Sequence, residues 1–166
     1  QRWKTFKLSM RPRFKTTADV DRAGTRVSTD GPSRLDYPVF PDSPVKSLDT
    51  FVLDEVLSNA WNHAGQHMYS SYFQDQYVSD LHNAMGGHSP HGLYAHVYIN
   101  GLYWGMYYVH ERPDDSWAAE MFGGEKEEYD CIKHSTARVV NNGNGISGGA
   151  VANFNAMLSA ANAVAA

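Results

Sequence analysis

The sequence predicts an α+β domain built on an antiparallel β-sheet with packed helices, and three observations lead to this class. Two strand-like runs, residues 94–99 and 102–110, are separated by Asn100-Gly101, a dipeptide that favours the two-residue type I′ turn of a β-hairpin. A helical segment over residues 113–122 directly follows the hairpin. A second helical pattern, over residues 68–85, precedes it.

The predicted hairpin is apolar or aromatic on both faces. Ala95 and Val97 share one face of the first strand while Tyr94 and Tyr98 share the other, because side chains alternate along a strand. Residues 103–109 repeat this pattern on the second strand. We therefore expect the ribbon to lie between two layers rather than to face water.

The helix after the hairpin has recognisable ends. Pro113 suits the first helical position, and Asp114 and Asp115 suit the positive end of the helix dipole. Gly123-Gly124 ends the helix, because glycine adopts the left-handed cap conformation without steric cost.

The helix over residues 68–85 carries its apolar side chains at helical spacing, and Gly86-Gly87 closes it. The stripe that we expect to face the sheet consists of Phe73, Tyr77, Leu81 and Ala84. The polar side chains of Gln74, Asp75 and Ser79 would then face water. Short strands are expected at residues 48–53 and 129–133, and an alanine-rich helix at 150–166. Residues 11–44 predict a long loop, with a polar insertion at 15–33.

Composition limits the possible classes of protein. The 166 residues suit one domain or a piece of a larger one. Fourteen basic against eighteen acidic residues give a net charge of −4, and the absence of a dense Lys/Arg stripe argues against nucleic-acid binding. A single cysteine, Cys131, excludes an internal disulfide framework. No apolar run long enough for a membrane span occurs, and a start at Gln1 leads us to expect a chain that begins internally.

Lys4 is the first candidate for an ionic site, because the alternation along residues 4–10 places its side chain on the apolar face of the strand. A buried ammonium needs an anionic partner or a ligand, although a lysine at a strand end can also extend to water. Asp54-Glu55 could bind a metal but more often such a pair faces solvent. His63 and His67 have a four-residue spacing that zinc sites use, yet no HExxH motif accompanies them.

Aromatic residues make up 13% of the chain, which raises a non-enzymatic possibility. The array formed by Tyr103, Trp104, Tyr107 and Tyr108 could stack on sugars or peptides. The alternative is that most of these rings fill a two-layer core.

Several motifs resemble those of the CotH-like kinases, a family named for a bacterial spore-coat protein. The most specific is the hairpin YAHVYINGLYWGMY at residues 94–107, followed by ERPD at 111–114 and by FGG at 122–124 ahead of Tyr129-Asp130. Upstream, KTFKL at 4–8, LDYPVF at 35–40 and QDQYVSDL at 74–81 are similar to family segments in the same order. The resemblance spans most of residues 3–133.

The resemblance implies a protein-kinase-like small lobe, the β-rich part that covers the nucleotide, in an atypical secreted or surface Ser/Thr protein kinase. Such a kinase uses ATP and Mg²⁺ to phosphorylate a protein substrate, here a Ser/Thr-containing surface or spore-coat protein. Lys4 would contact the phosphates, and the strand from Met106 to Glu111 would lie beside the adenine near the hinge. Glu111 would be a hinge-side or ion-pair carboxylate, or alternatively a strand-end residue that pairs with Arg112 or caps the next helix.

The chain departs from the family pattern at functional positions. Asp54 follows Leu53 where family members carry arginine, and Gln74 also stands where an arginine is expected. The family's metal-binding segments, Asn-x-Asp and Trp-Asp-x-Asp, do not occur. We therefore expect residues 1–166 to form a single partial domain that lacks its C-terminal catalytic part, with no catalytic or metal-binding residue of its own. The alternative function is a non-catalytic surface or adhesion module that binds a protein or glycan.

Overall fold

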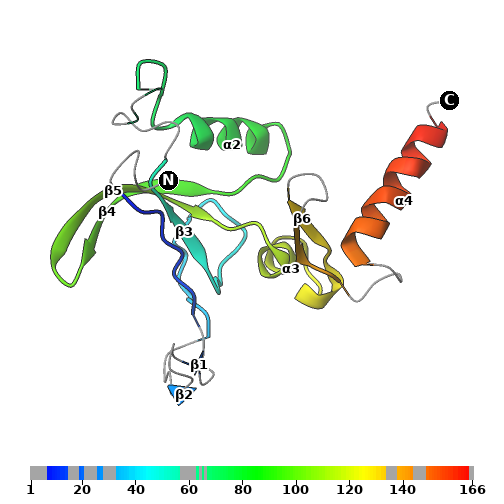
Figure 1. The fold of residues 1–166 in the computed structure, drawn as a ribbon, viewed down its shortest axis with the longest axis horizontal. Coiled ribbons are helices and arrows are strands. Elements are labelled where there is room, and N and C mark those ends of the chain that lie inside the picture. Colours follow the sequence, from blue (N-terminus) through cyan, green and yellow to red (C-terminus); the bar gives the residue numbers. More distant parts are fainter. Residues whose placement is uncertain are drawn as a thin grey trace. The chain divides into compact units, whose positions relative to one another are not determined.

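The structure is a computed structural model that describes residues 7–14, 19–20, 26–27, 33–56, 63, 65, 67–133, 138–143 and 149–164. The chain divides into two compact units, Gln1–Arg112 and Pro113–Ala166, and each is described by itself. Figure 1 shows the order of their elements along the chain. Lys4 lies outside the described residues.

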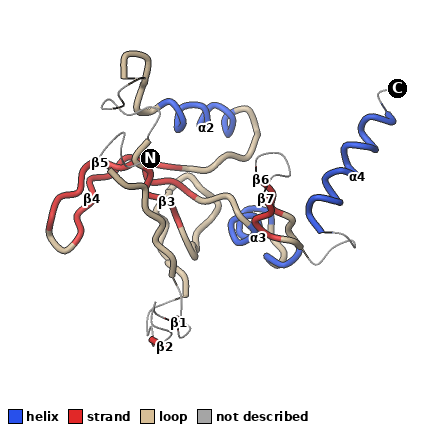
Figure 2. The backbone as a smooth tube through the Cα atoms, in the orientation of Figure 1, coloured by secondary structure: helices blue, strands red, loops and turns tan. Residues whose placement is uncertain are grey.

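The first unit is organised around a three-stranded antiparallel sheet with the order β3-β5-β4. Its strands are β3 (Phe51–Asp54), β4 (Gly92–Ile99) and the central β5 (Leu102–Glu111). Asn100 and Gly101 have φ angles of 50° and 79°, so the turn between β4 and β5 is of the primed type that the sequence predicts. The hairpin extends past the end of β3, as Figure 2 shows.

Two layers cover the base of the hairpin. On one face lies the loop before β3, whose Phe40 and Val45 are buried, and on the other lies α2 (Gln74–Ala84). Tyr108 points toward α2, because its hydroxyl donates to Gln76 Oε1 at 2.9 Å. The prediction of a ribbon between two layers is thus confirmed for residues 107–109 and wrong for the tip, where Tyr98 and Leu102 are exposed. The covering elements do not extend that far along the strands.

Helix α2 is turned the other way from the predicted orientation. Tyr77 is 61% exposed, and Phe73 and Leu81 are also exposed, whereas Gln76 is only 9% exposed. The reason is a close polar approach at Gly92, where a β-carbon would lie 2.4 Å from Gln76 Oε1. The hydrogen bond from Tyr108 holds the Gln76 face against the sheet, so the apolar stripe faces outward.

The amino-terminal segment runs along β3 and extends the sheet through single bridges. Met10 pairs with Leu53, and Arg13 pairs with Thr50. The expected strand at 48–53 is therefore present, shifted to 51–54. In the insertion, β1 (Asp19–Val20) pairs with β2 (Arg26–Val27).

The second unit begins with α3 (Asp115–Phe122), whose N-cap is Asp114. The Asp114 side chain accepts a hydrogen bond from Trp117 N at 3.3 Å, so Pro113 precedes the cap instead of opening the helix. The remaining elements are the 3₁₀ helix η2 (Lys126–Glu128), β6 (Cys131–Lys133), β7 (Arg138–Asn141) and α4 (Gly149–Val164). Across the part of the chain that the structure describes, no helix has the length and apolarity needed to cross a membrane.

Candidate functional site

Lys7 is held against the outer side of β5 by three neutral groups. Its ammonium donates to the carbonyl of Met106, lies 3.3 Å from the Tyr72 hydroxyl, and lies 3.9 Å from the centroid of the Tyr107 ring. The last distance is a close cation–π contact. We call Lys7, Tyr72, Met106 and Tyr107 the Lys7 cluster.

The local backbone explains why the Met106 carbonyl is open to these donors. The ladder between β3 and β5 ends at the pair Asp54–Tyr108, so β5 has no β3 partner at residue 106. The Lys7 ammonium and the Tyr72 hydroxyl both donate to the Met106 carbonyl in place of a β3 residue, and the Tyr72 oxygen lies 2.9 Å from the carbonyl oxygen. Gly105 has a φ of 113° beside them and presents no side chain to Lys7. The lysine side chain occupies the space that a side chain at Gly105 would face, since a β-carbon there would lie 3.8 Å from Lys7 Nζ.

The charge on Lys7 has no direct counter-charge within the described part of the chain, where its ammonium forms no ion pair. Burial lowers the pKa of Lys7, while the nearby negative charges of Glu55 and then Asp54 act in the opposite direction. A partly desolvated cation that only neutral groups hold can accept an anion.

The turn after β3 places Glu55 inside the protein. Glu55 is 4% exposed, so the expectation that both carboxylates of this pair face solvent is wrong for Glu55. Asp54 accepts hydrogen bonds from Ser9 Oγ at 3.0 Å and from Val56 N at 2.8 Å. Val56 has a φ of 57°, a strained conformation for a β-branched residue, and the Asp54 bonds hold it there.

The tyrosine hydroxyls of the cluster are hydrogen-bond donors. Burial raises the pKa of Tyr72 to about 12, with smaller contributions from Tyr94 and Asp54. Burial also raises the pKa of Tyr107, whose hydroxyl donates to Leu8 O at 3.1 Å. Both side chains therefore stay protonated near neutral pH. Tyr107 connects β5 to the amino-terminal segment, and Tyr72 connects β5 to the segment before α2.

Glu111 lies at the opposite end of β5 and is 0% exposed. Its carboxylate accepts hydrogen bonds from the Ser43 hydroxyl, from His91 N at 2.9 Å, and lies 3.2 Å from His91 Nδ1. These bonds join the loop before β3 to the start of β4. Met106 and Glu111 are five positions apart, which corresponds to about 16 Å of strand. The two predicted cofactor residues therefore lie far apart along β5, and only Glu111 is paired with β3.

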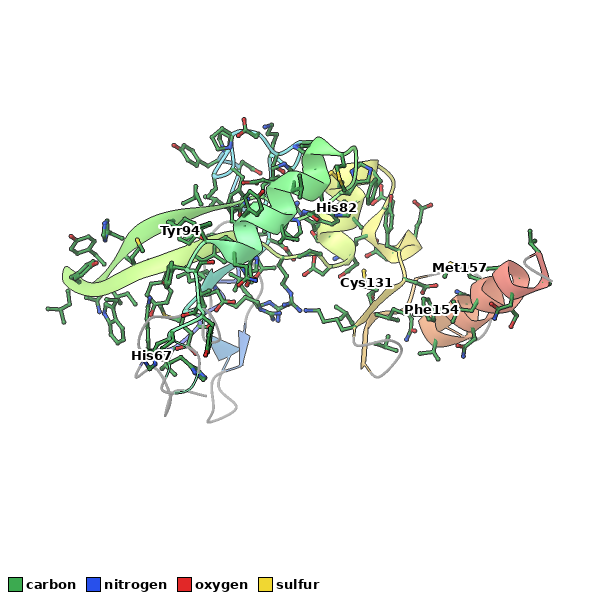
Figure 3. The ribbon with its side chains drawn as sticks, turned by 90° about the horizontal axis from the view of Figure 1, so that it is seen from above. His67, His82, Tyr94, Cys131, Phe154 and Met157 are labelled. Atoms are coloured by element: carbon green, nitrogen blue, oxygen red, sulfur yellow. The ribbon has the colours of Figure 1, made fainter. Side chains whose placement is uncertain are left out.

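Other candidate sites are arranged differently from the sequence-based hypotheses. Tyr107 and Tyr108 are buried, which leaves only Tyr103 and Trp104 of the aromatic array exposed. His67 Nδ1 contacts the backbone oxygen of His63 at 3.1 Å. Cys131 (Figure 3) is half-buried, and burial raises its pKa to about 11, so its thiol is a poor nucleophile. No group of three or more metal-ligating side chains occurs among the residues that the structure describes.

The order of elements around the sheet defines the class of protein. An antiparallel sheet with β5 between β3 and β4, and a helix that joins β3 to β4, is consistent with the small lobe of a kinase-like fold. Protein kinases place a lysine on the strand before that helix and pair it with a helix glutamate. Here β3 ends in Asp54 and α2 contains no glutamate, whereas Lys7 lies on the segment beside β3.

Comparison with known proteins gives the family. The family described as CotH kinase protein matches residues 42–161, and the chain belongs to this CotH kinase family. No curated protein matches the chain, and no solved structure matches it.

Sequence reasoning missed Lys7, although the same motif contains Lys4. The strand alternation placed Lys7 on the polar side of its strand. The alternation does not show that the Met106 carbonyl lacks a β3 partner and can therefore accept a hydrogen bond from Lys7. Gly105 was the one local signal for a close neighbour on β5.

Proposed function

We propose that this chain is the ATP-binding part of a secreted or surface Ser/Thr protein kinase, with the nucleotide laid along Met106–Glu111 of β5. Lys4 and Lys7 of the amino-terminal segment would attract its phosphates. The observation that carries the proposal is the Lys7 ammonium, fixed beside the Met106 carbonyl by neutral groups alone.

An anion is the ligand that this environment favours. A phosphate oxygen supplies the negative charge that Lys7 lacks, and a charge-assisted hydrogen bond is about twice as strong as a neutral one. The Tyr72 hydroxyl already donates its proton to the Met106 carbonyl, and it helps to hold the ammonium in place by accepting a hydrogen bond from Lys7. Glu111 would act as a positioning residue, since its carboxylate already holds Ser43 and His91 at the end of the same edge.

The magnesium ligands do not fit the described residues, which contain no suitable carboxylate cluster. Bound Mg²⁺ would neutralise charge on the transferred phosphoryl group. We propose that its ligands lie outside the described residues, and we assign no catalytic residue in this chain. The acceptor would be a serine or threonine hydroxyl of a surface or coat protein.

A titration with a fluorescent ATP analogue, in the presence of MgCl₂, tests the proposal. We expect Lys7→Ala and Lys4→Ala each to weaken binding about tenfold, because each removes a charged contact worth about 1.5 kcal/mol. Lys126→Ala is the matched control, since Lys126 is an exposed lysine whose ion pair with Glu127 spans 3.8 Å. Equal affinity of all three variants and the parent would exclude the proposed phosphate contacts.

The exposed hairpin tip favours a second candidate function, a non-catalytic module that binds glycans. Tyr98 and Tyr103 are both exposed, with ring centroids 5.2 Å apart, and Trp104 is exposed beside them in sequence. Exposed rings can stack on the apolar faces of sugars. A glycan array should then give hits that Tyr103→Ala and Trp104→Ala abolish, and an array without hits would remove this candidate.

A further inference from the structure

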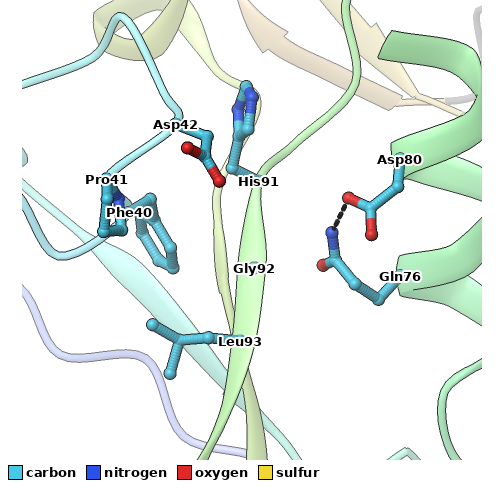
Figure 4. Close-up of a pocket in the computed structure, with 8 residues that line it drawn as sticks. All are labelled: Phe40, Pro41, Asp42, Gln76, Asp80, His91, Gly92 and Leu93. Atoms are coloured by element: carbon cyan, nitrogen blue, oxygen red, sulfur yellow. Dashed lines mark hydrogen bonds between the residues drawn. The ribbon is translucent and has the colours of Figure 1, made fainter. Parts of the chain in front are cut away.

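A pocket of about 230 Å³ opens at the outer edge of β4, away from the Lys7 cluster (Figure 4). Three structural elements form it: the loop before β3, helix α2, and the first residues of β4. Its lining residues are Phe40, Pro41, Asp42, Gln76, Asp80, His91, Gly92 and Leu93.

The floor of the pocket is the free edge of a sheet. β4 pairs only with β5 among the described strands, so its other side carries no strand. His91 O accepts a hydrogen bond from Glu111 N at 2.9 Å and therefore points toward β5. Because backbone groups alternate along an antiparallel strand, the N–H and C=O of Gly92 point outward, into the pocket. No hydrogen bond to either group occurs within the described part of the chain.

The walls of the pocket carry negative charge. Asp42 comes from the loop and Asp80 from α2, and the two lie on different sides of the β4 strand in Figure 4. Gln76 donates to Asp80 Oδ1 and so holds one carboxylate in place. The lining includes no lysine and no arginine. Phe40 and Leu93 add an apolar surface on the Asp42 side of the β4 strand, as Figure 4 shows.

We propose that this pocket docks an extended segment of a partner protein that carries a lysine or arginine side chain. The partner's backbone would pair with Gly92 and continue along the outward-facing backbone of Tyr94 and His96, as in β-strand addition. Its basic side chain would lie between Asp42 and Asp80, with the aliphatic stem on Phe40 and Leu93. Asp42 and Asp80 are both exposed, and their two negative charges favour a basic segment over a neutral or an acidic one.

His91 is common to this pocket and to the nucleotide proposal, in which Glu111 holds it, but Asp42 and Asp80 are not used there. The charge variants at Asp42 and Asp80 therefore test the docking proposal separately. Gly92 has a structural reason to be glycine as well, since a β-carbon there would lie 2.6 Å from the Tyr108 ring. Variants of Gly92 would therefore disturb α2 packing, and the test relies on charges and on the peptide backbone instead.

Fluorescence anisotropy with the full chain and no nucleotide tests the inference. The probe is a labelled ten-residue peptide that alternates lysine with threonine, and a second probe has glutamine in place of each lysine. We expect the lysine peptide to bind and the glutamine peptide to bind at least about tenfold more weakly. Asp42→Asn/Asp80→Asn should weaken binding of the lysine peptide about three- to tenfold, because each exposed charge pair contributes up to about 1 kcal/mol.

Two controls separate this groove from general attraction to an acidic chain. Glu127→Gln removes one exposed negative charge elsewhere and should leave affinity within about twofold. A lysine peptide with N-methyl groups at alternate positions keeps its charge but cannot pair as a strand, and it should bind at least about tenfold more weakly. Equal binding of the methylated peptide, or an unchanged affinity of the double variant, would overturn the proposal. If Asp80→Asn does not fold, Asp42→Asn alone decides the charge test with the same two outcomes.

Discussion

The Lys7 ammonium lies 3.9 Å from the centroid of the Tyr107 ring, and Tyr107 is fully buried at the centre of the sheet. This contact joins a half-buried lysine of the amino-terminal segment to the buried core of the first unit. The Tyr107 hydroxyl also donates to Leu8 O, the residue after Lys7. The position of the Lys7 charge is therefore set by the core and not by the side chain alone.

Tyr107→Phe separates the hydroxyl from the ring. The variant loses the 3.1 Å hydrogen bond to Leu8 O and keeps the aromatic face under Lys7. We expect the free energy of unfolding to fall by about 1 kcal/mol. Urea titration followed by tryptophan fluorescence measures this change. Tyr37→Phe, at an exposed tyrosine, is the control, and an equal effect of the two substitutions would contradict the assigned bond.

Glu111→Gln tests the buried carboxylate at the end of β5. The amide nitrogen of glutamine cannot accept hydrogen bonds, so one of the donors from Ser43 or His91 loses its partner. The expected loss of unfolding free energy is about 1–3 kcal/mol. Glu127→Gln, at an exposed position, should change it by less than about 0.5 kcal/mol. Thermal unfolding of both variants measures the difference. Equal melting temperatures would show that the hydrogen bonds from Ser43 and His91 to Glu111 do not stabilise the fold.

The reversed orientation of α2 gives opposite expectations for neighbouring residues. Gln76→Ala removes the acceptor of the Tyr108 hydroxyl, and should lower the free energy of unfolding by about 1–3 kcal/mol. Tyr77→Ser changes an exposed ring and should stay within about 0.5 kcal/mol. Replacement of an exposed apolar side chain should also raise solubility. A larger destabilisation by Tyr77→Ser than by Gln76→Ala would restore the orientation that the sequence pattern predicts.

His110 makes the stability of the first unit depend on pH. Burial lowers the pKa of His110 below its ordinary value of 6.5, and the Glu111 carbonyl and the Asp54 charge oppose this shift only in part. The unfolded chain then binds the proton more readily, so His110 contributes stability above pH 6.5 that is lost as the pH falls from there toward the lower, folded pKa. Denaturant titrations from pH 7.5 downward measure the slope. His110→Gln should flatten it, and an identical slope in the variant would refute the assignment.

The sequence predicted the elements whose signals are local. Asn100-Gly101 specified the hairpin turn, and Gly123 ended α3. Periodicity located the other elements less accurately, because the helix predicted over residues 68–85 begins only at Gln74. The orientation of α2 could not be predicted, because the hydrogen bond from Tyr108 to Gln76 outweighs the helix's own apolar pattern. The burial of Glu55 likewise depends on the strained backbone at Val56, which composition does not reveal.

The candidate site was predicted only in part for a related reason. The motif identified Met106 and Glu111, and both lie on β5, but Lys7 became visible only once the end of the β3 ladder was known. The roles of Lys4, Met106 and Glu111 toward a nucleotide stay predictions, as does a magnesium site outside the described residues.

Labelling with an acyl-phosphate derivative of ATP probes the proposed nucleotide site, because this reagent acylates the lysines that lie beside the phosphates of a bound nucleotide. We expect mass spectrometry to find the label on Lys7 or Lys4, and an excess of unmodified ATP to suppress it. Label confined to Lys46, Lys126 and Lys133, or label that ATP does not suppress, would contradict a nucleotide site on this edge of β5.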